Sequence, residues 1–227
     1  MDPFARFTLA VADPAGLLPL DEATLCIAAV LDPGVDVEAN LQVLDELAAR
    51  CPSPTLDALM RHLFGAKGEG FRGNPEDYYD PRNSFLHEVL RRRVGIPISL
   101  CVLAMEVGRR LGVPMDGVGM PGHFLLRDKV DTSVFCDPYN RGRFLDAAGC
   151  ESLFRSTVGS ERPWYPGFLD PVPRPAIVAR VLANLHGIYE RRRDLLARGA
   201  VARLRLAMPD LPQAERSALE TSLARWN

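Results

Sequence analysis

One stretch of the chain, residues 94–127, indicates the class of fold: VGIPISLCVLAMEVGRRLGVPMDGVGMPGHFLLR. Its first half is apolar and begins at Pro97, a residue that loses no hydrogen bond in the first turn of a helix. Gly112 is the residue type that commonly ends one. After Val113 the sequence changes to short β-prone runs separated by glycine. A helix over 97–111 followed by strands predicts an α+β protein.

Further segments after this stretch extend the strand region. Residues 132–139 (TSVFCDPY) and 142–146 (GRFLD) are short, β-prone and bounded by turn residues. We therefore expect two or three antiparallel strands in all. A short helix is predicted at 147–157, and the proline-rich residues 161–175 are expected to form a linker or a strap on the surface.

Helices are predicted on both sides of this region. Apolar residues at three- and four-residue spacing indicate most of them, and Asp32-Pro33-Gly34 separates the first two into a hairpin. Asp80 followed by Pro81 is a typical helix start. These helices are predicted at residues 20–31, 36–50, 54–65 and 81–93, and three more within 174–226.

The composition is that of an ordinary globular protein, with 47% hydrophobic and 25% charged residues in a chain of 227. A formal net charge of −2 favours neither nucleic acid nor an anionic membrane as the main partner. Charges and prolines interrupt residues 1–26, so they do not resemble a signal peptide. The apolar residues 94–105 are too few for a bilayer, which needs roughly 20. We expect a soluble cytoplasmic protein.

The sequence predicts no metal site and no cofactor. Its five cysteines are an odd number without CxxC spacing, which argues against a disulfide framework and a zinc site. Residues 87–91 (HEVLR) differ from the zinc-protease motif H-E-x-x-H, because Arg91 occupies the position of the second histidine. Residues 68–73 (GEGFRG) follow no predicted strand, so they do not indicate a dinucleotide-binding loop.

His123 and Asp137 are the strongest candidates for chemistry. His123 precedes a predicted strand, and Asp137 lies fourteen residues later on the expected neighbouring strand. An antiparallel pair would bring the carboxylate beside the imidazole and fix its tautomer. With a nucleophile opposite, this pair makes a catalytic triad; without one, it fixes the hairpin. Spacing alone leaves both interpretations open.

The nucleophile is the less certain member. Cys101 lies four residues after Pro97, in the second helical turn among apolar neighbours, which is typical of a buried cysteine rather than of an activated one. Ser99 is the only hydroxyl in the first turn. With Glu106 and Arg110 it forms a polar stripe on the opposite face of the helix, which we expect to be solvated. The two candidates cannot both serve one His–Asp pair.

Four motifs carry a family resemblance. N-S-F-L at 83–86, G-I-P-I-S-L at 95–100, P-G-H-F at 121–124 and D-P-Y at 137–139 are similar, in this order, to those of the transglutaminase-like family of the SirB-one type. The resemblance implies three regions. They are an N-terminal helical region (1–69), a transglutaminase- or papain-like core with a small antiparallel sheet (70–160), and C-terminal helices similar to tetratricopeptide repeats (174–227). The last region is too short to be stable alone, so we expect it to dock on the core.

The resemblance also assigns roles to the candidate residues. His123 and Asp137 match the His and Asp of the transglutaminase triad, but Pro97 occupies the position of the nucleophilic cysteine. This predicts a catalytically degenerate protein that binds a peptide or a protein in the former active-site cleft. The alternative is an active cysteine hydrolase or acyltransferase that uses Cys101, His123 and Asp137. If the C-terminal helices leave an apolar face uncovered, we also expect a homodimer.

Overall fold

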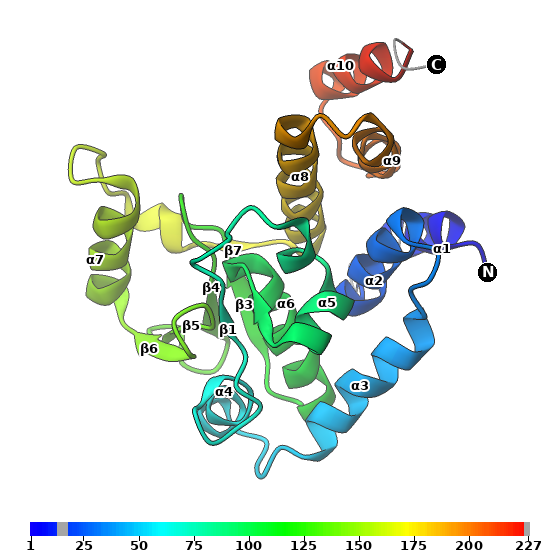
Figure 1. Cartoon of the computed structure of the whole chain (residues 1–227). Helices are drawn as coiled ribbons and strands as arrows, with labels where there is room; N and C mark the ends of the chain where they lie inside the picture. Colours follow the sequence, from blue (N-terminus) through cyan, green and yellow to red (C-terminus); the bar gives the residue numbers. More distant parts are fainter. Residues whose placement is uncertain (13–17, 225–227) are drawn as a thin grey trace.

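The computed structural model describes residues 1–12 and 18–224 and has the α+β architecture that the sequence predicts (Figure 1). Residues 13–17, part of the segment compared above with a signal peptide, and residues 225–227, which include the end of the predicted last helix, lie outside the described residues. Helix α6 (Pro97–Leu111) lies in the middle, between the N-terminal helices and the sheet.

Four helices form the N-terminal part. Three of them were predicted and one, α1, was not. Aspartate or threonine side chains cap α1, α3 and α4 by accepting a hydrogen bond from a backbone N–H in the first turn. The helices are α1 (Pro3–Val11), α2 (Leu20–Leu31), α3 (Val37–Ala49) and α4 (Leu56–Phe64).

The helix predicted over 81–93 is interrupted. Asp80 does cap its start, since its carboxylate accepts from the Arg82 N–H at 3.0 Å. However, Pro81–Asn83 form only the 3-10 turn η1, and α5 begins afresh at Leu86 and ends at Arg92. The break lies at Phe85, whose backbone is extended. Here the carbonyl of Asn83 is free to accept a hydrogen bond from Ser99 on α6 at 2.6 Å.

The polar stripe on α6 is not solvated, so that prediction was wrong. Ser99 and Glu106 are buried, and Glu106 has no exposed surface. Glu106 forms ion pairs with Arg109 and with Arg174 of the C-terminal helix α8 (Arg174–Arg192). Beside it, Asp21 of α2 accepts from Arg110 at 2.8 Å. The stripe is therefore a buried ionic network that joins three helices.

Five strands form an antiparallel sheet in the order β6-β5-β4-β3-β7. Four of them follow one another in the predicted strand region, which is more than the two or three strands expected there. The fifth, β7, comes from the proline-rich residues 161–175, which thus add the 3-10 turn η2 (Pro166–Leu169) and an edge strand instead of only a surface strap. The strands are β3 (Met115–Val118), β4 (Leu125–Asp128), β5 (Phe135–Asp137), β6 (Arg143–Leu145) and β7 (Pro171–Val172).

Two smaller features complete the sheet side of the molecule. β1 (Arg72–Gly73) and β2 (Val94–Gly95) form a short parallel pair. Helix α7 (Ala147–Val158) follows β6 and contributes Phe154 to a small core that includes residues of the sheet.

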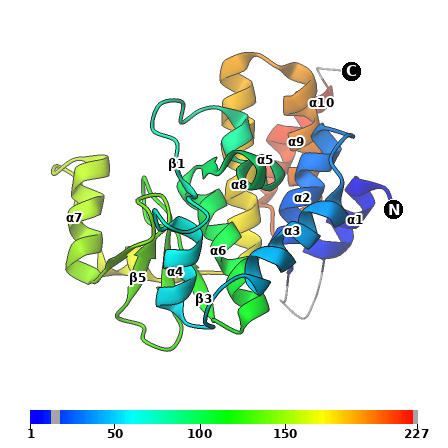
Figure 2. The ribbon, with the colours of Figure 1, turned by 60° about the horizontal axis from the view of Figure 1, so that its bottom comes forward.

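The C-terminal helices are α8, α9 (Leu195–Leu206) and α10 (Gln213–Ala224). The apolar face predicted for α8, which includes Val178 and Leu185, is buried. One continuous core extends from Phe7 to Met208, and α9 contacts α1 and α2 (Figure 2). All three predicted regions share this core, so their division stays a prediction.

Candidate functional site

His123 and Asp137 lie in contact beside the sheet. Nε2 of His123 is 2.9 Å from Oδ1 of Asp137, and both side chains are buried. A turn holds His123 just before β4, because its N–H donates to the Met120 carbonyl at 3.1 Å, while Asp137 ends β5. The neighbouring strands thus place the imidazole and the carboxylate side by side.

Asn140 fixes the carboxylate from its other side. Its side-chain amide donates to Oδ2 of Asp137 at 2.6 Å, and its backbone N–H donates to Oδ1 at 3.3 Å. Burial opposes the charged form of Asp137, but the hydrogen bonds from His123 and Asn140 outweigh it and lower the pKa of this carboxyl group. The sequence analysis missed Asn140; an asparagine three residues after an aspartate in an Asp-Pro turn was the available signal.

The imidazole of His123 has one nitrogen available for chemistry. Nε2 contacts Asp137, and within residues 1–12 and 18–224 no hydrogen bond to Nδ1 is found. The ring of Tyr139 stands edge-on to the imidazole, with ring centroids 5.8 Å apart. In the tautomer that carries its proton on Nε2, directed at Asp137, Nδ1 has a lone pair that can accept a proton.

Cys101 is buried beneath this pair. Its side chain has no exposed surface, and its thiol donates to the Phe124 carbonyl, with Sγ and O 3.6 Å apart. Burial, reinforced by the nearby carboxylate of Asp137, raises the pKa of the Cys101 thiol well above its ordinary value. The sulfur is therefore held as a neutral thiol, which is a poor nucleophile.

The other two candidate positions at the start of α6, Ser99 and Pro97, have structural roles. Ser99 accepts from the Ile96 N–H at 3.1 Å and donates to the Asn83 carbonyl at 2.6 Å, so both functions of its hydroxyl are used. Pro97, at the position where the resemblance requires the nucleophile, is the first residue of α6 and is buried. It carries no nucleophilic atom.

Arg180 on α8 reaches the histidine turn from the C-terminal helices. Its Nη2 donates to the carbonyls of His123 at 3.0 Å and Met120 at 3.3 Å, and its guanidinium lies over the ring of Phe124 at 5.3 Å. Gly119 leaves room for it, because a Cβ there would lie 3.2 Å from Nη1. No pattern in the sequence indicates this contact, which joins residues 57 positions apart.

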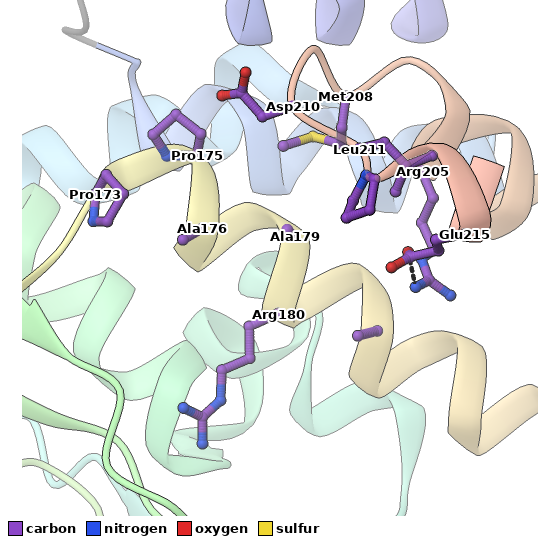
Figure 3. Close-up of a pocket in the computed structure, with 12 residues that line it drawn as sticks. Pro173, Pro175, Ala176, Ala179, Arg180, Arg205, Met208, Asp210, Leu211 and Glu215 are labelled. Atoms are coloured by element: carbon purple, nitrogen blue, oxygen red, sulfur yellow. Dashed lines mark hydrogen bonds and ion pairs between the residues drawn. The ribbon is translucent and has the colours of Figure 1, made fainter. Parts of the chain in front are cut away.

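A pocket of about 540 Å³ lies elsewhere, between α8 and the segment that leads into α10 (Figure 3). Its lining is mainly apolar and includes Ala179, Met208 and Leu211. Arg180 contributes to the lining, but its guanidinium points away from Met208 and Leu211 and toward the sheet. The pocket therefore does not contain the His–Asp pair.

Among the described residues there is neither a cluster of metal-binding side chains nor a helix that could span a membrane. No group of three or more His, Cys, Asp or Glu side chains lies close enough together to hold a metal ion. No helix among residues 1–12 and 18–224 is long and apolar enough to cross a membrane.

Comparison with known proteins identifies the family. The profile of the transglutaminase-like superfamily matches residues 36–183. A UPF0162 protein of Xylella fastidiosa (strain Temecula1) is 41% identical over 216 residues, which are 88% of this chain and 75% of the relative. A UPF0162 protein of Pseudomonas aeruginosa is 32% identical over 90% of this chain and 83% of its own length.

A eukaryotic relative matches a shorter part. The F-box only protein 21 of Mus musculus is 42% identical over 116 residues, which are 47% of this chain and 18% of that protein. No solved structure matches the chain. The profile match over more than half of the chain and the bacterial relatives that align with most of it show that the chain belongs to the transglutaminase-like superfamily and to its UPF0162 branch, the SirB-one type.

Proposed function

We propose that this chain is a catalytically degenerate transglutaminase-like protein that binds a segment of a peptide or of a partner protein beside His123. The observation that carries the proposal is the burial of Cys101, whose thiol donates to a backbone carbonyl instead of facing an open cleft. Pro97 at the usual nucleophile position supports the same conclusion.

Hydrolysis or acyl transfer by a cysteine requires a thiolate that can reach the substrate. A raised pKa keeps Cys101 protonated, and complete burial keeps a substrate carbonyl away from the sulfur. Triad residues act as a unit, so a His–Asp pair without a competent nucleophile retains little of the rate. His123 and Asp137 then serve as a rigid polar element of a binding site.

Exposed aromatic side chains beside the pair support binding. Tyr78 and Tyr79 are 39% and 56% exposed, and the ring of Tyr78 stands edge-on to Tyr139, with centroids 6.4 Å apart. Tyr139 in turn contacts the imidazole of His123. Tyrosine is enriched at protein interfaces, because it offers a large apolar area and a hydroxyl at a low entropy cost.

The alternative is an active cysteine hydrolase or acyltransferase. The intact hydrogen bond between His123 and Asp137 favours it, since this is the geometry that activates a nucleophile. It requires the Cys101 sulfur to leave the Phe124 carbonyl and to become accessible to a substrate.

Alkylation by iodoacetamide near neutral pH, followed residue by residue by mass spectrometry, separates the two functions. We expect partly exposed Cys51 to react first and Cys101 to react as slowly as buried Cys26. On an array of random hexapeptides, binding should survive Cys101→Ala and weaken in Tyr79→Ala. Fast labelling of Cys101 that is slowed by His123→Ala would support the enzyme instead, and an array without Tyr79-dependent binding would refute the binding function.

A further inference from the structure

One edge of α8 presents two arginines. Arg180 and Arg191 are eleven residues apart, close to three helical turns, so they lie on the same side of the helix and roughly 16 Å apart along its axis. Gly187 lies between them, and a Cβ added there would meet no atom within 4 Å. The helix surface between the two arginines is therefore open.

The positive charge of this edge is not neutralised by the protein. Among the described residues, neither Arg180 nor Arg191 has a carboxylate within ion-pair distance, although many other arginines do. The one acid of α8, Glu190, pairs with Arg198 of α9 at 2.7 Å. An arginine that is partly removed from water without a counter-ion retains an unmet capacity to bind an anion.

The tyrosine loop, residues 74–80, forms the other side of this surface. The guanidinium of Arg191 lies over the ring of Tyr79 at 4.2 Å, and Arg180 lies near Tyr78. Glu76 and Asp77 of the same loop are exposed, and neither forms an ion pair with the two arginines. The surface thus combines aromatic rings with two uncompensated cations.

The arginine edge continues to the His–Asp pair. Nη2 of Arg180 donates to the His123 carbonyl at 3.0 Å, and its guanidinium points toward the sheet (Figure 3). Nη2 makes both hydrogen bonds found for Arg180 in the described residues, so Nε and Nη1 keep their N–H groups for another acceptor. A ligand beside His123 can therefore reach this guanidinium.

We infer that the edge of α8 and the tyrosine loop bind an extended segment of a partner protein with two carboxylates four residues apart. This rests on the proposed function and adds the chemical class of its ligand. In an extended chain, which advances roughly 3.3 Å per residue, side chains four residues apart point to the same side and lie roughly 13 Å apart, a span that the long side chains of Arg180 and Arg191 can match. The tyrosine rings would contact the residues between the two carboxylates.

The test uses a fluorescein-labelled pentapeptide with glutamate at both ends and three alanines between them. One comparison peptide has glutamine at both ends, and another has two adjacent glutamates. In fluorescence anisotropy at low ionic strength, we expect the first peptide to bind about tenfold more tightly than the glutamine peptide. The peptide with adjacent glutamates should bind with intermediate affinity, and added salt should reduce the difference.

Arg180→Gln and Arg191→Gln should each lose most of the tenfold preference. Arg191 is exposed, so its variant tests the inference even if Arg180→Gln disturbs the histidine turn. Arg203→Gln is the matched control, because Arg203 also lies over an aromatic ring, Phe4 at 5.4 Å, but belongs to α9. This variant should keep the full preference.

Three outcomes would overturn the inference. They are equal affinity for the glutamate and glutamine peptides, no measurable binding of the glutamate peptide, and tighter binding of a labelled hexanucleotide. Equal affinities that fall in Tyr79→Ala would leave the proposed binding function standing and remove only its preference for acidic segments. Nucleotide binding would mean that the arginines recognise polyanions in general.

Discussion

At the scale of single residues, Asp137 and Cys101 are both buried, but their pKa values shift in opposite directions. Three hydrogen bonds stabilise the charged form of Asp137, so this buried group remains an anion. Within the described part of the chain, the hydrogen-bond partner of Cys101 is a carbonyl oxygen, which accepts from a neutral thiol and offers nothing to a thiolate. The hydrogen-bond partners, rather than the depth of burial, thus decide that Asp137 is charged and that Cys101 is a neutral, unreactive thiol.

Asp137→Asn tests this at the level of stability. Because the pKa of Asp137 is lowered in the folded protein, its contribution to the free energy of unfolding is present above the ordinary carboxyl range. It is lost as the pH falls below about 4 and through the folded pKa. We expect the variant to be about 1 to 3 kcal/mol less stable near neutral pH and to lose less stability on acidification than the wild type.

Urea unfolding at a series of pH values measures both effects. Asp210→Asn is the control, because Asp210 is an exposed carboxylate between α9 and α10. A constant difference between wild type and Asp137→Asn from neutral pH to about pH 2 would show that the carboxylate is not favoured by folding.

At the scale of elements, the sequence predicted where α6 begins and ends but not what surrounds it. Pro97 and Gly112 act through the backbone of their own helix, so local rules suffice to identify them. A glutamate in the sequence looks the same whether its helix face is buried or exposed to solvent, so residue type alone does not reveal that Glu106 is buried. Glu106 is buried by Arg174 and by the neighbouring helices. Arg174 is 68 residues away in sequence, so no local pattern indicates that it contacts Glu106.

Strand β7 and the break before α5 were missed for the same reason. Val172 stands between two prolines, Pro171 and Pro173, and β7 joins the sheet only because the edge of β3 is available to it. The extended backbone at Phe85 is stabilised by the bond from Ser99 to the Asn83 carbonyl, again a contact between elements. The sequence could therefore predict elements and the His–Asp pair, but not Arg180 or the ionic network.

Glu106→Ala tests whether the network holds the helices together. Removing this carboxylate leaves Arg174 without its ion pair at a mostly buried position. We expect a loss of about 2 to 4 kcal/mol, somewhat reduced because the arginines reach solvent. Glu88→Ala is the matched control, since Glu88 pairs with exposed Arg91 and its loss should cost about 0 to 1 kcal/mol.

Chemical denaturation of both variants measures the difference. Adding Arg174→Met to a Glu106→Leu background should recover part of the stability, because a buried apolar pair needs no counter-charge. Equal losses in Glu106→Ala and Glu88→Ala would mean that the network contributes no more than a surface ion pair.

At the scale of the whole molecule, the candidate site depends on regions far apart in the sequence. The sheet supplies His123 and Asp137, α6 supplies Cys101, and α8 supplies Arg180. The C-terminal helices are thus part of the same structure as the site. This gives a physical reason to expect that the region similar to tetratricopeptide repeats does not fold or act alone.

Two truncations test this dependence. Helix α8 buries seven residues against the core, whereas α10 buries one, Leu219, and packs on α9. We expect residues 1–212 to unfold cooperatively with a slightly lowered Tm, since α10 contributes little beyond the pair between Arg205 and Glu215 and the hydrogen bonds from Arg216 to the carbonyls of Leu206 and Met208. Residues 1–173 expose the apolar faces of α2 and α6 that α8 covers, so they should lack a cooperative transition in thermal circular dichroism. If residues 1–173 instead unfold cooperatively, with a Tm within a few degrees of that of the full chain, the core folds without α8. The sheet alone would then hold the histidine turn in place without Arg180.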